Sequence, residues 1–235
     1  MADTDALKQA VGLEAAGLVE DGMVLGLGTG STVAHFLLAL SERLARGELN
    51  SILGVPTSIR TEQESRKLGI PLTSLSEHPT LDLTVDGADE VDPNLNLIKG
   101  LGGALLREKM VAQASSRLAI MVDESKVVAA LCEKAPVPIE VVKFGWETHE
   151  HFLQSLGGDS VLRRLPDGEP VTSDNGNHII DCYFPGGIDD PEVLEGALAA
   201  RTGVVESGLF IGMATQVIVA ASEGVRHLYA GREQL

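Results

Sequence analysis

Residues 85–109 have the sequence VDGADEVDPNLNLIKGLGGALLREK, and the fold of the whole chain can be worked out from this segment. The apolar run Leu81 to Val85 predicts a buried strand, so Asp86 and Asp89 follow its carboxyl end. Ligands bind at that edge in open α/β sheets. Two small residues between the aspartates permit a tight turn, and both carboxylates can therefore face one pocket.

The second half of the segment carries a lysine, a glycine-rich bend and a helix. Lys99 precedes glycines that let the backbone approach a ligand closely. Helical spacing gives Glu108 apolar neighbours three and four residues away, whereas Lys109 belongs to the polar face. A carboxylate on an apolar face has a buried cationic partner or is desolvated for a task. From the residues alone, a structural ion pair and a general base are equally good interpretations of Glu108.

Upstream, the apolar residues 23–27 predict a strand that leads through Gly26-Leu-Gly-Thr-Gly-Ser-Thr32 into a helix. Ser31 fits the N-cap position of that helix. Free backbone N–H groups and the helix dipole make such a loop an anion site. The loop lacks the third glycine of a dinucleotide fingerprint and the lysine of a P-loop. The adjacent hydroxyls of Ser31 and Thr32 favour a small phosphate monoester instead.

Strands and helices alternate through the first half of the chain, which implies a doubly wound, mostly parallel (Rossmann-like) α/β sheet. After Lys134 the predicted order becomes β-α-β-β-α-β, the ferredoxin-like split arrangement. A further strand at 216–220 returns to the large sheet. We therefore expect a discontinuous large α/β domain, residues 1–132 plus 210–235, and an inserted smaller ferredoxin-like α+β domain, residues 133–209.

The composition excludes several classes of partner. Eighteen Lys and Arg stand against 34 Asp and Glu, a net charge of −16 that should repel nucleic acid and anionic membranes. No signal peptide and no apolar run of about 20 residues is evident. The two cysteines lack the spacing of a metal site or a redox pair, and we interpret His149 and His151 as surface residues of an exposed helix. The sequence thus predicts a cytoplasmic protein without a metal.

Short motifs spread along essentially the whole chain together resemble ribose-5-phosphate isomerase of type A. Their order and spacing match the family, although Leu101 and Leu106 stand where many members have glycine and threonine. The matching motifs are Gly28-Thr-Gly-Ser-Thr32, Asp86-Gly-Ala-Asp89, Lys99-Gly100, Arg107-Glu-Lys109, Asp123-Glu-Ser-Lys126 and Ser173-Asp-Asn-Gly-Asn177. The last of these is most simply a hairpin turn, and we interpret it as structural.

The resemblance implies interconversion of D-ribose 5-phosphate and D-ribulose 5-phosphate without a cofactor, in a homodimer or homotetramer. By position, Glu108 corresponds to the proton-transferring base, and Asp86, Asp89 and Lys99 join it as expected catalytic residues. The expected substrate-binding residues are Lys8, Thr29, Gly30, Ser31, Thr32, Asp86, Gly87, Ala88, Asp89, Lys99, Gly100, Leu101, Gly102 and Lys126.

The chemistry of these side chains suits that reaction. Aldose–ketose isomerisation moves a proton between C2 and C1 through an enediolate, and it needs a base, a cation for the developing oxyanion and a grip on the phosphate. Two alternatives use similar folds. A sugar-phosphate-sensing regulator would carry a DNA-binding helix-turn-helix and a basic face, and a coenzyme A transferase would need a site for a long pantetheine–nucleotide ligand.

Overall fold

The computed structural model describes residues 4–230, apart from the Thr4 side chain, and the chain forms two compact units. The first unit takes the described residues up to Ala88, then Arg107–Val127 and the residues from Met213 onward. The second unit takes Asp89–Leu106 and Val128–Gly212. The sequence analysis had placed residues 89–106 in the large domain and had set the boundaries of the small domain at 133 and 209.

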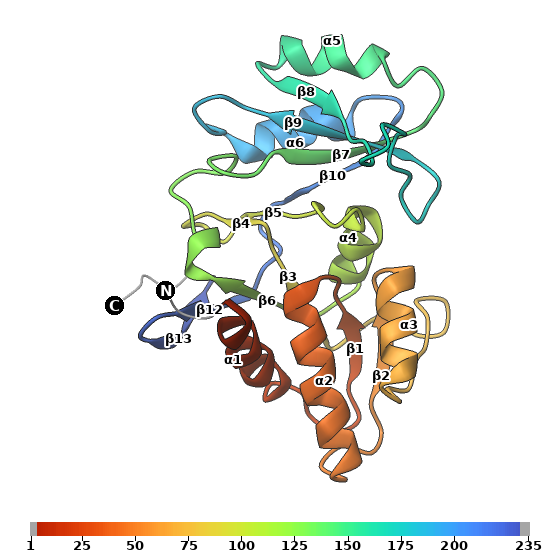
Figure 1. The fold of residues 1–235 in the computed structure, drawn as a ribbon, viewed down its shortest axis with the longest axis vertical. Helices are drawn as coiled ribbons and strands as arrows, with labels where there is room; N and C mark the ends of the chain where they lie inside the picture. The colour runs from red at the N-terminus through yellow and green to blue at the C-terminus, as the bar shows by residue number, and fades with distance from the viewer. Residues whose placement is uncertain (1–3, 231–235) are drawn as a thin grey trace. The chain divides into compact units, whose positions relative to one another are not determined.

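The first unit is built on a six-stranded sheet with the order β13-β12-β6-β3-β1-β2 (Figure 1). Only the pairing of β12 with β13 is antiparallel. This confirms the predicted doubly wound, mostly parallel sheet, to which β13 adds an edge strand that was not predicted. The strands are β1 (Val24–Leu27), β2 (Leu53–Pro56), β3 (Leu83–Gly87), β6 (Leu118–Asp123), β12 (Gln216–Ala221) and β13 (Gly224–Tyr229).

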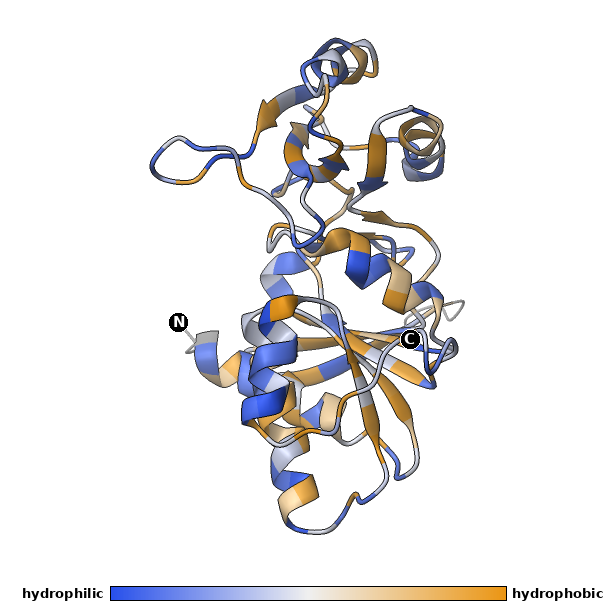
Figure 2. Ribbon diagram, turned by 90° about the vertical axis from the view of Figure 1, so that its right-hand side faces the viewer, coloured by the Kyte–Doolittle hydropathy of each residue, from blue (hydrophilic) through white to orange (hydrophobic). Residues whose placement is uncertain are grey.

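Helices α1 (Thr4–Ala16) and α2 (Ser31–Ala45) pack against each other and against one face of this sheet. Fully buried side chains such as Phe36 and Leu40 on α2 meet strand residues such as Leu25. Each of these side chains contributes about 1.5–3 kcal/mol by leaving water. Figure 2 shows the result, with apolar strands inside the layer and polar outer faces on the helices.

The first unit also contains helix α3 (Ile59–Lys67) and helix α4 (Leu105–Gln113) from Arg107 onward. The contact between α4 and the sheet is close at Gly26, because a Cβ there would lie 2.5 Å from Cγ1 of Val111. A glycine in the middle of β1 therefore lets α4 approach the strand. This approach brings the helix that carries Glu108 against the sheet.

The second unit contains a four-stranded antiparallel sheet with the order β10-β7-β9-β8 and two helices. Its chain order, β7-α5-β8-β9-α6-β10, is the predicted ferredoxin-like arrangement, with the first and third strands in the middle. The elements are β7 (Val137–Val141), α5 (Thr148–Ser155), β8 (Asp159–Leu162), β9 (His178–Tyr183), α6 (Pro191–Ala199) and β10 (Val204–Ser207).

A small three-stranded sheet, β11-β5-β4, accounts for the difference in the boundaries. Strands β4 (Glu90–Val91) and β5 (Leu97–Ile98) form an antiparallel pair, and β11 (Leu209–Phe210) joins β5 from the other end of the small domain. The carboxylate of Glu90 is buried and accepts backbone N–H groups of Cys132, Lys134 and Ala135 at 2.5–2.7 Å. These bonds tie residues 89–106 into the second unit.

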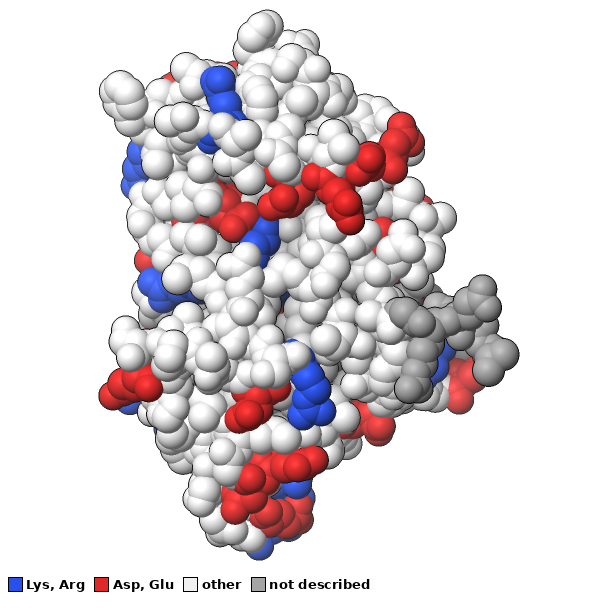
Figure 3. Space-filling view, turned by 180° about the vertical axis from the view of Figure 1, so that it is seen from behind, with Lys and Arg blue, Asp and Glu red and all other residues white. Residues whose placement is uncertain are grey.

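Charge and hydropathy limit what the surface can do. On the face drawn in Figure 3, acidic side chains gather in several groups, whereas Lys and Arg stand as isolated side chains. Within residues 4–230, no helix has both the length and the apolar character needed to cross a membrane. The same residues contain no cluster of three or more His, Cys, Asp or Glu side chains arranged for a metal ion.

Candidate active site

The glycine-rich loop after β1 turns the chain into α2. Gly30 is the N-cap of this helix, has φ +127° and forms no side-chain cap, so the prediction of Ser31 as N-cap is wrong. The left-handed φ, which suits glycine, starts the helix one residue earlier than the capping pattern indicates. Ser31 thus lies in the first turn, where its Oγ accepts a hydrogen bond from Nζ of Lys8 at 2.9 Å. A lysine beside exposed N–H groups at a helix start favours a bound anion.

Asp86 fixes the other side of this loop. It lies inside β3, one residue before the end of that strand, and not after the strand as predicted. The residue is 1% exposed, and its Oδ1 accepts the backbone N–H groups of Thr29 at 3.0 Å and Gly87 at 2.8 Å. At least one oxygen of this carboxylate therefore serves to hold the loop.

Three hydroxyls from the beginning of α3 surround the side chain of Thr29. Thr57, Ser58 and Thr61 are buried, and each has its hydroxyl oxygen within 3.0 Å of Thr29 Oγ1. Sequence analysis had not identified these three residues as part of a site. The available signal was their position, since Thr57 and Ser58 directly follow the carboxyl end of β2, next to β1 in the sheet.

Glu108 lies in the first turn of α4 and is 5% exposed. Its neighbours three and four residues away are all buried, as the spacing predicts. Lys109 is also buried, at 3% exposed, so its placement on the polar face is wrong. The buried neighbours of Glu108 and Lys109 show that α4 is covered on both of these sides, which keeps the Glu108 carboxylate away from bulk water.

Lys126 ends the short helix η1 (Glu124–Lys126), which follows β6. Strand β6 is the neighbour of β3 in the parallel sheet, so Lys126 belongs to the same edge as Asp86 and the glycine-rich loop. The Asp123 side chain caps η1 by accepting the N–H of Ser125 at 2.9 Å. The first unit therefore holds two candidate lysines for a phosphate, Lys8 and Lys126.

Gly87, Ala88 and Thr32 belong to the first unit, whereas the other predicted residues, Asp89, Lys99, Gly100, Leu101 and Gly102, belong to the second unit. Lys99 is 3% exposed, and its Nζ lies 5.4 Å from the centre of the Phe210 ring, within the range of a cation–π contact. The Asp89 carboxylate accepts the N–H of Leu101 at 2.9 Å. Gly100 has φ +105°, so this bend needs glycine.

An arginine that the sequence did not reveal also holds this bend. Nη1 of Arg163 donates to the carbonyl oxygens of Gly100 and Leu101, both at 3.0 Å. The same guanidinium forms a two-pronged ion pair with Asp181 at 2.5 and 2.8 Å. Arg163 is more than 60 residues away from the bend in the chain, and a single sequence gives no indication of this pairing.

A second buried glutamate has a different setting. Glu140, on β7, is fully buried, and its Oε1 accepts hydrogen bonds from Ser173 Oγ at 2.8 Å, Asn175 Nδ2 at 3.1 Å and Asn177 Nδ2 at 2.9 Å. These donors close the turn between residues 172 and 178. The contacts support the structural interpretation of this motif and give Glu140 a role in folding.

His149 is 3% exposed, so its interpretation as a surface residue is wrong. It occupies the buried side of α5, and burial lowers its pKa, as does the nearby charge of Arg201. Burial also raises the pKa of the Cys182 thiol to about 12, and both cysteines are free. A thiol with so high a pKa is not a nucleophile at neutral pH.

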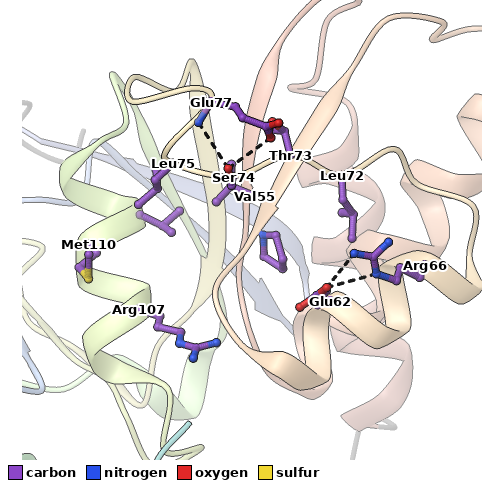
Figure 4. Close-up of a pocket in the computed structure, with 12 residues that line it drawn as sticks. Val55, Glu62, Arg66, Leu72, Thr73, Ser74, Leu75, Glu77, Arg107 and Met110 are labelled. Carbon is purple, nitrogen blue, oxygen red and sulfur yellow. Dashed lines mark hydrogen bonds and ion pairs between the residues drawn. The ribbon is translucent and has the colours of Figure 1, made fainter. Parts of the chain in front are cut away.

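A pocket of about 470 Å³ in the first unit lies among β2, α3, α4 and residues 72–77 (Figure 4). None of the predicted site residues lines it. Its two glutamates are engaged, Glu62 by Arg66 at 2.8 Å and Glu77 by the hydroxyls of Thr73 and Ser74 at 3.0 and 3.2 Å. We assign no reaction to this pocket, because its acidic groups serve local structure.

The fold and these residues define a class of protein: a two-unit α/β enzyme with a glycine-rich loop at a helix start and buried carboxylates near the carboxyl ends of the strands of a doubly wound sheet. Comparison with known proteins identifies the family. Residues 53–224 match the family of ribose 5-phosphate isomerase A (phosphoriboisomerase A). The chain therefore belongs to this family.

Individual relatives agree along nearly the full length. Ribose-5-phosphate isomerase A of Chloroflexus aurantiacus is 52% identical over 225 residues, which cover 96% of this chain and 94% of the relative. A solved D-ribose-5-phosphate isomerase in complex with phospho-erythronic acid has a TM-score of 0.94 and 44% identity, covering 97% of this chain and 99% of that chain. The enzyme from Plasmodium falciparum has a TM-score of 0.94 and 41% identity, covering 97% and 100%.

Proposed function

We propose that this chain interconverts D-ribose 5-phosphate and D-ribulose 5-phosphate, with Glu108 as the base that moves the proton between C2 and C1. Family membership supports the reaction, because the relatives named above are ribose-5-phosphate isomerases over almost their whole length. The observation that carries the choice of base is the burial of Glu108 in the first turn of α4, in the unit that holds the anion-binding loop.

The other candidate residues bind the phosphate, stabilise the enediolate and assist proton transfer between the oxygens. The N–H groups and hydroxyls of Ser31 and Thr32 hold the phosphate, with positive charge from Lys8 or Lys126. Lys99 stabilises the enediolate oxygen, and a buried ammonium is effective there because little water competes with it. Asp86 and Asp89 assist ring opening and proton transfer between the oxygens.

The catalytic candidates lie close together in the chain. Asp89 is three residues after Asp86, so their Cα atoms are at most roughly 11 Å apart. Glu108 is the second residue after the other crossing point, Leu106 to Arg107. The chain therefore passes between the units twice within the segment that carries the catalytic candidates.

Family membership also decides among the functions considered from sequence. A sensor or a coenzyme A transferase would belong to other families, and the matched relatives are isomerases. We further propose that the enzyme is cytoplasmic and works as a homodimer or homotetramer. Light scattering on the purified protein measures the assembly, and a monomer at working concentrations would contradict it.

The test is an isomerase assay with D-ribose 5-phosphate in EDTA, comparing the wild type with Glu108→Gln. We expect kcat to fall by about 10²–10⁴, the contribution typical of a positioned base, while the affinity for 4-phosphoerythronate is retained. Glu140→Gln is the matched control, because it also removes the charge of a buried glutamate and should lower stability with little change in kcat. A Glu108→Gln enzyme with nearly normal kcat would exclude Glu108 as the base.

A further inference from the structure

We propose that Thr29 is a positioning residue and not a ligand of the substrate phosphate, and that buried hydroxyls of Thr57, Ser58 and Thr61 hold it in place. The inference rests on the proposed function, because it concerns how the same loop binds a phosphosugar. It divides the four consecutive residues Thr29–Thr32 into one that is fixed inside the protein and three that can face the ligand.

The hydroxyl cluster consists of Thr29, Thr57, Ser58 and Thr61. Oγ1 of Thr29 lies 2.8 Å from Oγ1 of Thr57, 2.8 Å from Oγ of Ser58 and 3.0 Å from Oγ1 of Thr61. The three partners are 0%, 5% and 2% exposed, and Thr29 itself is partly buried, so water reaches these bonds only from the side of Thr29. A hydroxyl has one proton and two lone pairs, so the single proton of Thr29 can go to only one of these partners.

Each hydroxyl of the cluster has one proton, so the donors and acceptors can be followed from residue to residue. Thr61 donates to the carbonyl oxygen of Gly28 at 2.8 Å, and Ser58 donates to Thr61 at 3.0 Å. Thr29 then donates to Ser58 at 2.8 Å. The bonds thus return to the backbone of the residue that precedes Thr29, and they close a ring around the start of the loop.

Thr57 lies on another side of Thr29. Its hydroxyl lies 2.8 Å from that of Thr29 and donates to the Leu27 carbonyl at 3.0 Å, which also accepts the N–H of Thr57 at 2.9 Å. A carbonyl oxygen has two lone pairs and can accept both groups, and the proton of Thr29 goes to Ser58. The hydroxyl of Thr29 has no proton left for another acceptor.

The backbone of Thr29 is engaged as well, because its N–H donates to Oδ1 of Asp86 at 3.0 Å. A phosphate dianion accepts hydrogen bonds and needs donors. Since both donors of Thr29 are used inside the protein, the donors for the phosphate must come from Gly30, Ser31 and Thr32, together with a lysine. Thr29 instead connects the loop to β3 and to the start of α3.

The cluster also couples two local structures. Oγ of Ser58 caps α3 by accepting the N–H of Thr61 at 3.0 Å, so the residues that cap this helix are the ones that hold Thr29. Substitution of a buried hydroxyl that never meets the substrate should therefore weaken phosphate binding.

The experiment measures KM for D-ribose 5-phosphate, kcat, and the Kd of inorganic phosphate by calorimetry, which does not depend on turnover. We expect Thr61→Val to raise KM and the phosphate Kd about fivefold, the effect of one lost hydrogen bond, with kcat within about twofold of the wild type. Thr29→Val should give the same pattern, and the double variant should be no worse than the poorer single variant. Thr61→Ser, which keeps the hydroxyl, should restore wild-type values.

Ser65→Ala is the matched control. Ser65 is a fully buried hydroxyl on the same helix, and its Oγ has no hydrogen-bond partner within the part of the chain that the structure describes. It should leave KM and the phosphate Kd unchanged. Thr57→Val provides a second member of the cluster if Thr61→Val does not fold.

Two results would overturn the inference. In the first, Thr29→Val weakens phosphate binding while Thr61→Val and Thr57→Val do not. In the second, the effects of Thr29→Val and Thr61→Val multiply in the double variant. Either result would make Thr29 a direct ligand. A wild type that binds phosphate but does not isomerise D-ribose 5-phosphate would contradict the proposed function and leave the test of the cluster intact.

Discussion

Gly28→Ala should disrupt the glycine-rich loop Gly28–Thr32 from a position that carries no functional group. A Cβ at residue 28 would lie 2.2 Å from Oδ1 of Asp86, 2.4 Å from its Cγ and 2.6 Å from its Cα. Rotation of the Asp86 side chain relieves the first two contacts only. The third involves backbone, so β1 and β3 would also have to separate at this point.

The expected loss of stability can be worked out from the hydrogen bonds that the displaced Asp86 carboxylate makes. Oδ1 of Asp86 accepts the N–H groups of Thr29 at 3.0 Å and Gly87 at 2.8 Å. Hydrogen bonds to a charged group contribute about 1.5–3 kcal/mol each, so their loss lowers the free energy of unfolding by about 3–6 kcal/mol. This is a large part of the 5–15 kcal/mol by which a typical domain is stable, about as much as some domains have in total.

Urea denaturation followed by circular dichroism measures this loss, and the isomerase assay measures its effect on the loop. We expect kcat/KM to fall mainly through KM, because Thr29 is no longer held. Gly196→Ala on α6 is the control, since nothing lies within 4 Å of its added Cβ and alanine favours helix by about 0.5–1 kcal/mol. A loss below about 1 kcal/mol for Gly28→Ala would show that the strands adjust freely, and the reasoning would fail.

Two further predictions concern the second unit. Arg163→Met should lower kcat/KM about tenfold or more with Glu108 untouched, because the carbonyls of Gly100 and Leu101 lose the two hydrogen bonds that one charged guanidinium nitrogen donates; steady-state kinetics measure this, and unchanged kinetics would show that the bend holds its shape alone. The pKa of His149 in the folded state lies below its ordinary value of 6.5, so just below pH 6.5 the unfolded chain binds more protons at this residue than the folded chain does. The contribution of neutral His149 to the free energy of unfolding should therefore be complete above pH 6.5 and fall as the pH decreases. In His149→Gln the Tm of the protein should lose this acid dependence between pH 5 and 6.5, and an identical slope in both proteins would refute the assignment.

Sequence pattern predicted the large elements and missed the small ones. The parallel strands of the first unit are short apolar runs between helices, a pattern that identifies them without tertiary information. Strands β4, β5 and β11 have two residues each, too few for any periodicity. Strand β11 pairs with β5 from far along the chain, and the Glu90 carboxylate on β4 bonds to backbone groups more than 40 residues away.

The same limit applies to individual side chains. Helical spacing correctly placed buried neighbours around Glu108, because that prediction depends only on residues within one turn. It misplaced Lys109 and His149, whose burial is caused by elements that pack on the helix from elsewhere. Ser31 failed as an N-cap because Gly30 adopts a backbone angle that capping statistics do not anticipate.

The Thr29–Thr32 motif shows why a match to a family does not assign a role to each residue in it. All four positions match, yet the contacts of Thr29 differ from those of Ser31. The N–H and hydroxyl of Thr29 both donate inside the protein, whereas Ser31 accepts from Lys8, which leaves its own proton directed away from that lysine. A loop binds a phosphate more tightly when part of the loop is already held in place. Ordering mobile hydrogen-bond donors costs entropy, and this cost lowers the affinity. We therefore expect the motif to include a residue that anchors the loop as well as residues that bind the phosphate.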